Sequence, residues 1–517
     1  MQSISKILPF CAAALWILPF TAQAVDIEGT FTSDSAFPVR ITDPSFYTLN
    51  GEAYSGEIDS DTNLTVNGIL SSYPSQNIIT VAASSTTAGN FTYNLELPAK
   101  FWSKNVFEVY TPITFSVENF TLNLRESATA HPNLIIYTGA DSALRVRGDF
   151  LFSDTRSSTG WYQTRLSFSG KGNGNVTIDG NFTINSQIPN PSGHAFNGVN
   201  FEVGIQTFTV GGVLSLSNSN GKNNNVFRTT ATSAGTFTRS LGGLQITQRG
   251  MIQLGGNVDA ANTTEMLFTN SGTSEYIGGL LTRDSDGELA DNKLNVRMTA
   301  SDAANGRQIM RFNTTSGWTL DNNVYSDAAN ALNEVEVSSG RLDLGMYGGM
   351  KGGSLRIMGY NRPSEAVFSA TGTVADTEIG KVVFDTMSFY RGTVFFDLAE
   401  TDGDFIQVDG AMTKIAGASP LVLELNVSAY DLQEWLGASE SDEWSADLMS
   451  FATEGSNVSA DDFTLKLQDG ITGKISISEL DGISTITANL SIVPEPAAVA
   501  ALISAFAFCA AARRRRK

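Results

Sequence analysis

The chain has 517 residues and a formal net charge of −20, with 53 acidic against 33 basic residues and only 2 histidines and 2 cysteines. So acidic a surface repels nucleic acid and anionic lipid at long range, which argues against a polyanionic partner. The scarcity of cysteine argues against a disulfide-stabilised fold and against a cysteine metal site.

Residues 1–24 have the pattern of a secretory signal peptide. Lys6 precedes an apolar run, and Ala22 and Ala24 supply the small residues that are required at the cleavage positions. We therefore expect the chain to be exported and its mature form to begin at Val25.

Residues 25–330 are rich in β-branched and aromatic residues punctuated by Gly, Asn and Ser, and they show no helical period of any length. Three segments align without a gap at a spacing of 32 residues, 143–153, 175–185 and 207–217. Apolar residues alternate with period two on both sides of a central glycine, which predicts two short strands that meet at a glycine bend. The equivalent apolar positions are Leu144/Val176/Phe208, Val146/Ile178/Val210, Phe150/Phe182/Leu214 and Phe152/Ile184/Leu216, and the bends fall at Gly148, Gly180 and Gly212.

A unit of two or three short strands repeated along the chain predicts an all-β fold. The architecture that fits best is a right-handed parallel β-helix, or β-solenoid, in which each turn stacks on the previous one and buries alternate side chains in a continuous core. Tandem antiparallel β-sandwiches are the alternative.

Residues 331–427 continue as glycine-bounded β-segments. They include Ser339-Gly-Arg-Leu-Asp-Leu, Gly392-Thr-Val-Phe-Phe-Asp-Leu, Asp402-Gly-Asp-Phe and Leu421-Val-Leu-Glu-Leu. These segments resemble the repeats in passenger domains of autotransporter-type bacterial surface proteins. The resemblance implies a β-helix that is displayed outside the cell.

The spacing of apolar residues in 428–492 differs from that in the repeats. Leu432, Trp435 and Leu436 have helical spacing, and strand-like segments return at 463–467, 474–477 and 484–490. We expect this region to be a small C-terminal cap over the open end of the solenoid, where an exposed strand edge would otherwise pair with another chain.

The end of the chain contains a Pro-Glu-Pro motif, an apolar run and a basic cluster, in that order. The motif is Val493, Pro494, Glu495 and Pro496, the run extends from Ala497 to Ala512, and the cluster is Arg513, Arg514, Arg515, Arg516 and Lys517. Sixteen helical residues span about 24 Å, which is short of the ~30 Å hydrocarbon core and predicts a weak transmembrane helix. Basic clusters stay cytoplasmic, so everything before the run faces the other side of the membrane.

This tail, residues 493–517, resembles the PEP-CTERM sorting signal of Gram-negative bacteria. The resemblance implies a transient inner-membrane anchor, cleavage at or near the motif by an exosortase-type protease, and release to the cell surface or the exterior. An ordinary membrane anchor without processing is the alternative. Without both terminal segments the chain keeps 27 basic residues (33 less six) against 53 acidic ones, a net charge of −26, and loses Cys11 and Cys509.

The sequence contains few residues or motifs that indicate catalysis or cofactor binding. His131 and His194 lie in proline-containing loops with no nucleophile motif beside them, and no phosphate loop, dinucleotide fingerprint or metalloprotease motif is present. We therefore expect no catalytic residue, no cofactor and no resident metal.

Weak calcium candidates are Asp284, Asp286 and Glu288, whose oxygens alternate along the chain, and Asp59 with Asp61 has a similar spacing. Neither group completes a calcium loop, because the glutamate expected at the twelfth position of an EF-hand is missing from both.

Two functions from different classes fit these observations. The first is an exported, non-catalytic cell-surface or extracellular-matrix protein that acts in adhesion or associates with exopolysaccharide or with glycans of host or neighbouring cells. The second is a secreted β-helix polysaccharide lyase or glycoside hydrolase. Acidic residues that gather with a basic or aromatic partner in one groove would favour the enzyme, since glycan cleavage requires two acids at one site.

Overall fold

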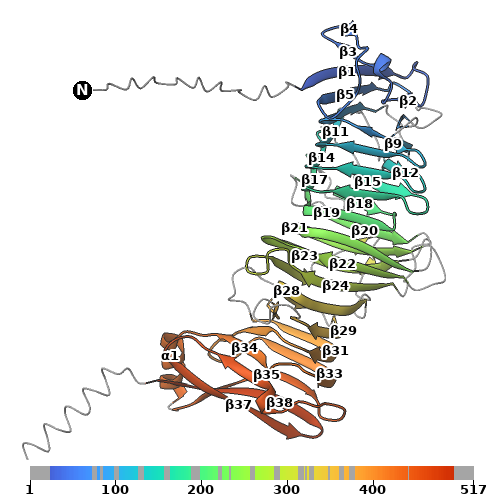
Figure 1. Cartoon of the computed structure of the whole chain (residues 1–517). Helices are drawn as coiled ribbons and strands as arrows, with labels where there is room; N and C mark the ends of the chain where they lie inside the picture. Colours follow the sequence, from blue (N-terminus) through green and yellow to red (C-terminus); the bar gives the residue numbers. More distant parts are fainter. Residues whose placement is uncertain are drawn as a thin grey trace, which may run out of the picture.

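The computed structural model of the chain is an elongated stack of β-strands (Figure 1). It describes residues 24–493 apart from 73–77, 82–84, 98–103, 126–132, 157–162, 188–197, 219–223, 232–234, 257–261, 284–291, 313–318, 321–322, 325–330, 347–349, 360–365, 372–378 and 440–441. The fold is all-β and is a parallel β-solenoid, which confirms the predicted fold class.

One face of the solenoid is a single parallel ladder that runs the length of the stack, each strand pairing with the one before it. Its members in order are β2 (Val39–Arg40), β6 (Ile79–Val81), β9 (Lys104–Val109), β12 (Asn133–Thr138), β15 (Gln163–Gly170), β18 (Gly198–Val203), β20 (Asn224–Ala231), β21 (Thr236–Gly256), β23 (Thr273–Arg283), β25 (Arg307–Phe312), β28 (Leu332–Met346), β30 (Ala366–Ser369), β32 (Thr393–Asp397), β34 (Leu421–Asn426) and β36 (Phe463–Lys466). The described chain is therefore one solenoid and not a row of sandwiches.

A second parallel ladder forms the other side and shares the long strands β21 and β28. It consists of β1 (Val25–Thr32), β5 (Thr62–Ile69), β8 (Phe91–Glu96), β11 (Phe120–Arg125), β14 (Phe150–Asp154), β17 (Phe182–Ser186), β19 (Thr207–Asn218), β21, β22 (Thr263–Phe268), β24 (Lys293–Thr299), β28, β29 (Gly352–Ile357), β31 (Lys381–Phe389), β33 (Phe405–Lys414) and β35 (Trp444–Ala452). A shorter column of β7 (Thr86–Thr87), β10 (Thr114–Val117), β13 (Ala143–Val146) and β16 (Asn175–Ile178) leads into the first half of β19.

The number of strands in a turn varies along the stack. Turns such as β10, β11, β12 and β13, β14, β15 contain three strands, whereas later turns such as β29, β30 and β31, β32 contain two. In the three-strand turns a short bend separates the first two strands, with a glycine at Gly148 and Gly180 and with Glu118-Asn119 between β10 and β11.

The 32-residue repeat is confirmed as successive turns of the solenoid. Val146 pairs with Ile178 and Ile178 pairs with Val210, and all three lie in one continuous buried core. Phe150 pairs with Phe182 in the same way, and the rings of Phe120 and Phe150 stack with centroids 4.6 Å apart. The period-two pattern therefore identifies the inward-facing side chains correctly.

The glycine bends have a steric cause that Gly180 illustrates. A Cβ atom at this position would lie 2.5 Å from Oδ1 of Asp149 and 2.6 Å from the carbonyl oxygen of Gly148 in the preceding turn. Only glycine lets the backbones of consecutive turns approach this closely.

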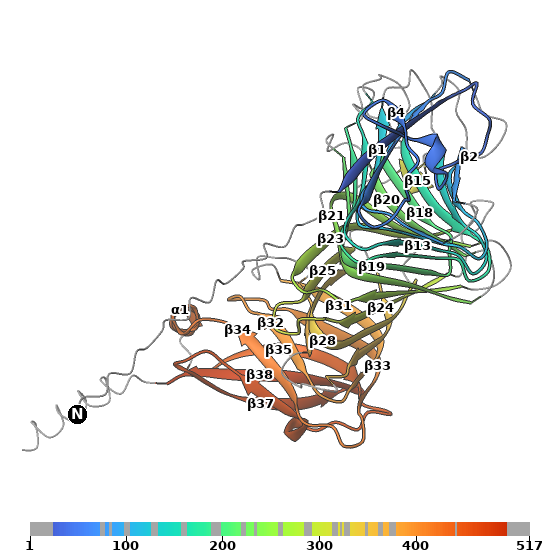
Figure 2. The same cartoon turned by 45° about the horizontal axis from the view of Figure 1, so that its top comes forward.

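Each end of the stack is covered by antiparallel structure. At the N-terminal end, the helical turn η1 (Pro44–Phe46) and the short strands β3 (Thr48–Leu49) and β4 (Glu52–Ala53) lie against β1. At the C-terminal end, β38 (Ile483–Ile492) pairs antiparallel with both β35 and β37 (Ile471–Leu480), and this sheet closes the lower end in Figure 2. Antiparallel caps of this kind occupy strand edges that would otherwise be open.

The region predicted as a cap contains the last solenoid turn as well as the closing hairpin. The predicted short helix is α1 (Ala429–Ser439), and β35 and β36 continue the two parallel ladders beyond residue 428. A one-turn helix, η4 (Ala460–Asp462), precedes β36, and an isolated hairpin is formed by β26 (Thr319–Leu320) and β27 (Asn323–Val324).

Candidate functional site

Most of the residues that the sequence singles out lie outside the described part of the chain. This applies to Ala22, Pro494 to Lys517, the histidines His131 and His194, and the calcium candidates Asp284, Asp286 and Glu288. Two boundary residues are described: Ala24 is exposed just before β1, and Val493 is 46 % exposed after β38. The N–H of Val493 donates to the carbonyl oxygen of Gly470 at 2.9 Å, so the chain leaves the folded body beside the closing hairpin.

Asp59 and Asp61 lie in the turn before β5. Oδ1 of Asp59 accepts hydrogen bonds from the hydroxyl of Thr62 at 2.9 Å and from the N–H of Asp61 at 3.0 Å. The Asp59 carboxylate thus caps a turn, which is a common role of aspartate in loops. Within the described ranges, no group of three or more His, Cys, Asp or Glu residues is placed to hold a metal ion.

In the part of the chain that the structure describes, no helix is long and apolar enough to cross a membrane.

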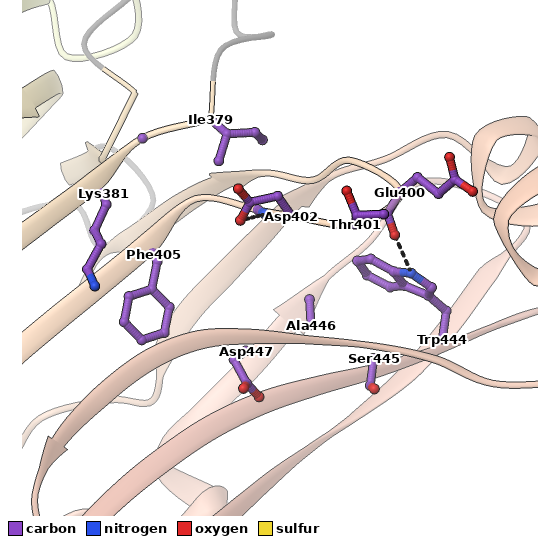
Figure 3. Close-up of a pocket in the computed structure, with 12 residues that line it drawn as sticks. Ile379, Lys381, Glu400, Thr401, Asp402, Phe405, Trp444, Ser445, Ala446 and Asp447 are labelled. Atoms are coloured by element: carbon purple, nitrogen blue, oxygen red, sulfur yellow. Dashed lines mark hydrogen bonds between the residues drawn. The ribbon is translucent and has the colours of Figure 1, made fainter. Parts of the chain in front are cut away.

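A pocket of about 510 Å³ lies near the C-terminal end of the solenoid (Figure 3). Its walls come from the start of β31, from the turn between β32 and β33, and from the first half of β35. The lining residues are Ile379, Gly380, Lys381, Glu400, Thr401, Asp402, Gly403, Phe405, Trp444, Ser445, Ala446 and Asp447. We refer to this hollow as the cap pocket.

The pocket exists because β33 and β35 diverge. Their pairing begins at Ile406 opposite Met449, so the residues of β35 that precede Met449 have no β33 partner. These residues pair only with β38 on their other edge. The backbone of Trp444 to Asp447 therefore faces the hollow along one edge instead of a neighbouring strand.

One wall is a tight turn that a buried carboxylate holds in place. Asp404 is fully buried, and its two oxygens accept hydrogen bonds from the N–H groups of Gly380 at 2.7 Å and Asp397 at 2.9 Å. The turn closes on itself through the N–H of Ala399, which donates to the carbonyl oxygen of Asp402 at 2.8 Å. Asp404 thus ties the turn to the start of β31.

Burial raises the pKa of Asp404 to about 7, and the nearby Asp397 and Asp343 act in the same direction. The two backbone hydrogen bonds oppose this effect, but desolvation is the larger cause. Asp404 therefore changes its protonation state near neutral pH, although its carboxylate points into the turn and does not line the pocket.

The opposite wall carries the indole of Trp444. Trp444 is half-buried, its ring lies 5.1 Å from that of Trp435 in α1, and its Nε1 donates to the carbonyl oxygen of Glu400 at 3.3 Å. On the same strand, Oδ1 of Asp447 accepts a hydrogen bond from the hydroxyl of Thr487 at 2.7 Å. Trp444 is therefore oriented by Trp435 and by the opposite wall of the pocket, and Asp447 by Thr487 of β38.

The charged groups of the cap pocket are three acids and one base. Glu400, Asp402 and Asp447 come from the two walls, and the ammonium of Lys381 lies 5.3 Å above the ring of Phe405 (Figure 3). Carboxylates accept hydrogen bonds from hydroxyl groups, and an indole offers a flat apolar surface beside them. This combination suits a polyhydroxylated ligand with an apolar ring face.

Sequence reasoning did not find this pocket. The sequence places the Asp402-Gly-Asp-Phe segment in a repeat and Trp444 in the predicted cap, and no local pattern indicates that they share a site. No protein-family model matches the chain, and no curated protein matches it.

Proposed function

We propose that this protein is an exported, non-catalytic protein of the bacterial surface or extracellular matrix that binds neutral glycans. The observation that carries the proposal is the cap pocket, whose lining combines the indole of Trp444 with three acidic residues, Glu400, Asp402 and Asp447. A sugar ring stacks its apolar face on an indole while its hydroxyl groups donate to carboxylates. The acidic composition of the chain disfavours a polyanionic glycan.

The test is a binding titration of the exported fragment, residues 25–496, against neutral oligosaccharides that represent bacterial exopolysaccharide and host glycans. Trp444→Ala should weaken binding by about tenfold or more, because aromatic anchors contribute strongly to recognition. Tyr430→Ala is the matched control, since Tyr430 lies in α1, is 75 % exposed and does not line the pocket. Equal affinities for the wild type and Trp444→Ala would overturn the assignment of the pocket.

A second candidate function is glycan cleavage at the same pocket. Three carboxylates and a lysine gather there with an aromatic residue, and a pair of carboxyl groups is the usual equipment of a glycoside hydrolase. In that case the wild type would release new reducing ends from a neutral polysaccharide, and Asp402→Asn or Asp447→Asn would abolish the release. Binding without release on prolonged incubation would support the non-catalytic function.

The proposed route to the surface depends on the terminal segments. We expect export through the signal peptide of residues 1–24 and transient anchoring through residues 493–517, with cleavage by an exosortase-type protease. Pro494 and Pro496 disfavour a helix at the motif and would keep it extended for the protease. Glu495→Ala should leave the unprocessed chain in the inner membrane, whereas a wild-type C-terminus by mass spectrometry would show that the tail is an ordinary anchor or linker.

A further inference from the structure

The outer surface of the early three-strand turns carries a regular pattern that neither the core nor the cap pocket explains. On β5, β8, β11, β14, β17 and the second half of β19, alternate side chains point outward and form three rows along the stack. The row next to the glycine bend contains Asn63, Asn90, Asn119, Asp149 and Asn181, the middle row contains Thr65, Thr92, Thr121, Leu151, Thr183 and Ser215, and the far row contains Asn67, Asn94, Asn123, Ser153 and Asn185. We refer to this surface as the Asn–Thr face, and its strands lie one above another in Figure 1.

The row beside the bend is held by hydrogen bonds between turns. Nδ2 of Asn119 donates to Oδ1 of Asn90 at 2.8 Å, and Oδ1 of Asn119 accepts from the N–H of Asp149 at 2.8 Å. The carboxylate of Asp149 then accepts from the N–H of Asn181 at 2.7 Å. The polar groups of these side chains are therefore used in hydrogen bonds within the row, and these bonds fix the spacing from one turn to the next.

The far row is linked in the same manner. Nδ2 of Asn94 donates to Oδ1 of Asn67 at 2.8 Å, and Nδ2 of Asn123 donates to Oδ1 of Asn94 at 2.9 Å. The hydrogen-bonded part of the far row ends at Asn123, so linked polar side chains border the middle row on both sides up to Thr121 and on the bend side beyond it.

The middle row itself has free hydrogen-bonding capacity. The hydroxyl groups of Thr65, Thr92, Thr121 and Thr183 have no hydrogen-bond partner among the residues that the structure describes, and none of these side chains is buried. Leu151 interrupts the row with an apolar side chain that is 38 % exposed. A row of hydroxyl groups with one apolar patch can both donate and accept, and can cover the apolar face of a ring.

The surface is also hollowed at this place. A shallow pocket of about 500 Å³ lies over β11, β14, β17 and β19, and its lining includes Asn119, Thr121, Leu151 and Thr183. Within the three rows Asp149 is the one charged side chain, in a protein whose net charge is −20. A neutral ligand matches this surface better than an ionic one.

We propose that the Asn–Thr face binds an extended, neutral polysaccharide laid along the axis of the solenoid. Neighbouring strands are about 4.8 Å apart, and a sugar unit in an extended β-linked chain advances by nearly the same distance. Successive sugars therefore meet one middle-row side chain in each turn, a threonine or serine hydroxyl except on β14, where Leu151 lies beneath the apolar face of one ring. The inference rests on the proposed glycan-binding function and assigns it a second, extended site.

The test is co-sedimentation of the exported fragment, residues 25–496, with microcrystalline cellulose and with chitin, both neutral and β-linked. Thr121→Val with Thr183→Val removes two hydroxyl groups at nearly constant shape and should lower retention by about tenfold or more. The matched control is Thr177→Val with Thr209→Val, two outward residues that pair on β16 and β19 across the bend. The control should retain the wild-type affinity, and equal melting temperatures by circular dichroism should show that both variants are folded.

Four outcomes would overturn the inference. Equal losses in the two double variants would remove the role of the middle row, and retention that Trp444→Ala abolishes while Thr121→Val with Thr183→Val does not would assign all binding to the cap pocket. The latter result leaves the proposed function standing. Thermal hysteresis of the wild-type solution without polysaccharide retention would show that the face orders ice instead of sugar, and failure of both polymers and of the soluble oligosaccharides would reject the glycan function itself.

Discussion

Some positions that belong to the inner rows of the solenoid are occupied by ionisable residues. Arg239 pairs with Phe208 and Met266 in an inner row and is fully buried. Its guanidinium donates to the carbonyl oxygens of Gln206 at 2.9 Å and Val203 at 3.2 Å, and burial lowers its pKa to about 9. A buried charge must be hydrogen-bonded, and here backbone carbonyl oxygens accept from the guanidinium in place of a carboxylate.

Asp404 makes the free energy of unfolding depend on pH. Its pKa is about 7 in the folded protein and near 3.8 in the unfolded chain, so between these values the folded state holds a proton that the unfolded state has lost. This group therefore lowers the free energy of unfolding as the pH rises from about 4 to 7, by on the order of a few kcal/mol, and has no further effect above pH 7.

Asp404→Asn should reduce this dependence. Urea midpoints measured at pH 5 and pH 8 should fall less in the variant than in the wild type, although the variant loses one backbone hydrogen bond at both pH values. Parallel falls in the two proteins would show that Asp404 does not titrate in this range.

At the scale of the strand, one of two adjacent residues is buried and the other is exposed, because side chains alternate between the two faces. Phe150 and Leu151 on β14 illustrate the alternation. Phe150 is 1 % exposed and packs between the rings of Phe120 and Phe182, with centroid distances of 4.6 and 4.8 Å, whereas Leu151 is 38 % exposed on the outer face.

Phe150→Ala should therefore lower the free energy of unfolding by about 3 to 5 kcal/mol, since it leaves a cavity in the aromatic stack. Leu151→Ser on the same strand should change it by no more than about 0.5 kcal/mol. Denaturant titrations of the two variants check the prediction. Similar effects at both positions would contradict the assigned faces of β14.

At the scale of the molecule, the solenoid is held together by contacts between neighbouring turns. Strand pairing is almost entirely between one turn and the next, as in the series β13, β16, β19 and β14, β17, β19. Stability of such an array is approximately the sum of the turns and of the interfaces between them. The caps at the two ends then matter more for solubility than for the fold of the middle.

Deletion of residues 175–206 should leave a folded protein, because it removes one complete 32-residue turn. Val146 would then stack on Val210 and β15 on β20, so all inward residues keep their faces. Deletion of residues 175–190 removes half a turn and should prevent folding of the N-terminal half. Far-UV circular dichroism and thermal melting distinguish the two, and equal behaviour of both deletions would contradict the turn boundaries.

Local sequence was sufficient to predict the all-β class, the stacking of 143–217 as successive turns, and the inward faces of the strands. The physical reason is that β-strand sterics alternate side chains between two faces, so burial leaves a period of two that is visible without knowledge of the partners. The helix around Leu432 was visible for the corresponding reason, through its helical spacing. Export and sorting through the two terminal segments stay predictions.

Only the tertiary structure decided which outward side chains meet. The amide rows join residues 27 to 32 positions apart, and the cap pocket joins Asp402 to Trp444, so the lengths of the intervening loops determine whether they are neighbours. Arg239 is another example. A charged side chain is expected at the surface, yet the register of β21 on β19 places this arginine in the core. The sequence by itself determined the faces of each strand, because alternation is local, whereas the winding of the chain determined the sites, because they are assembled across turns.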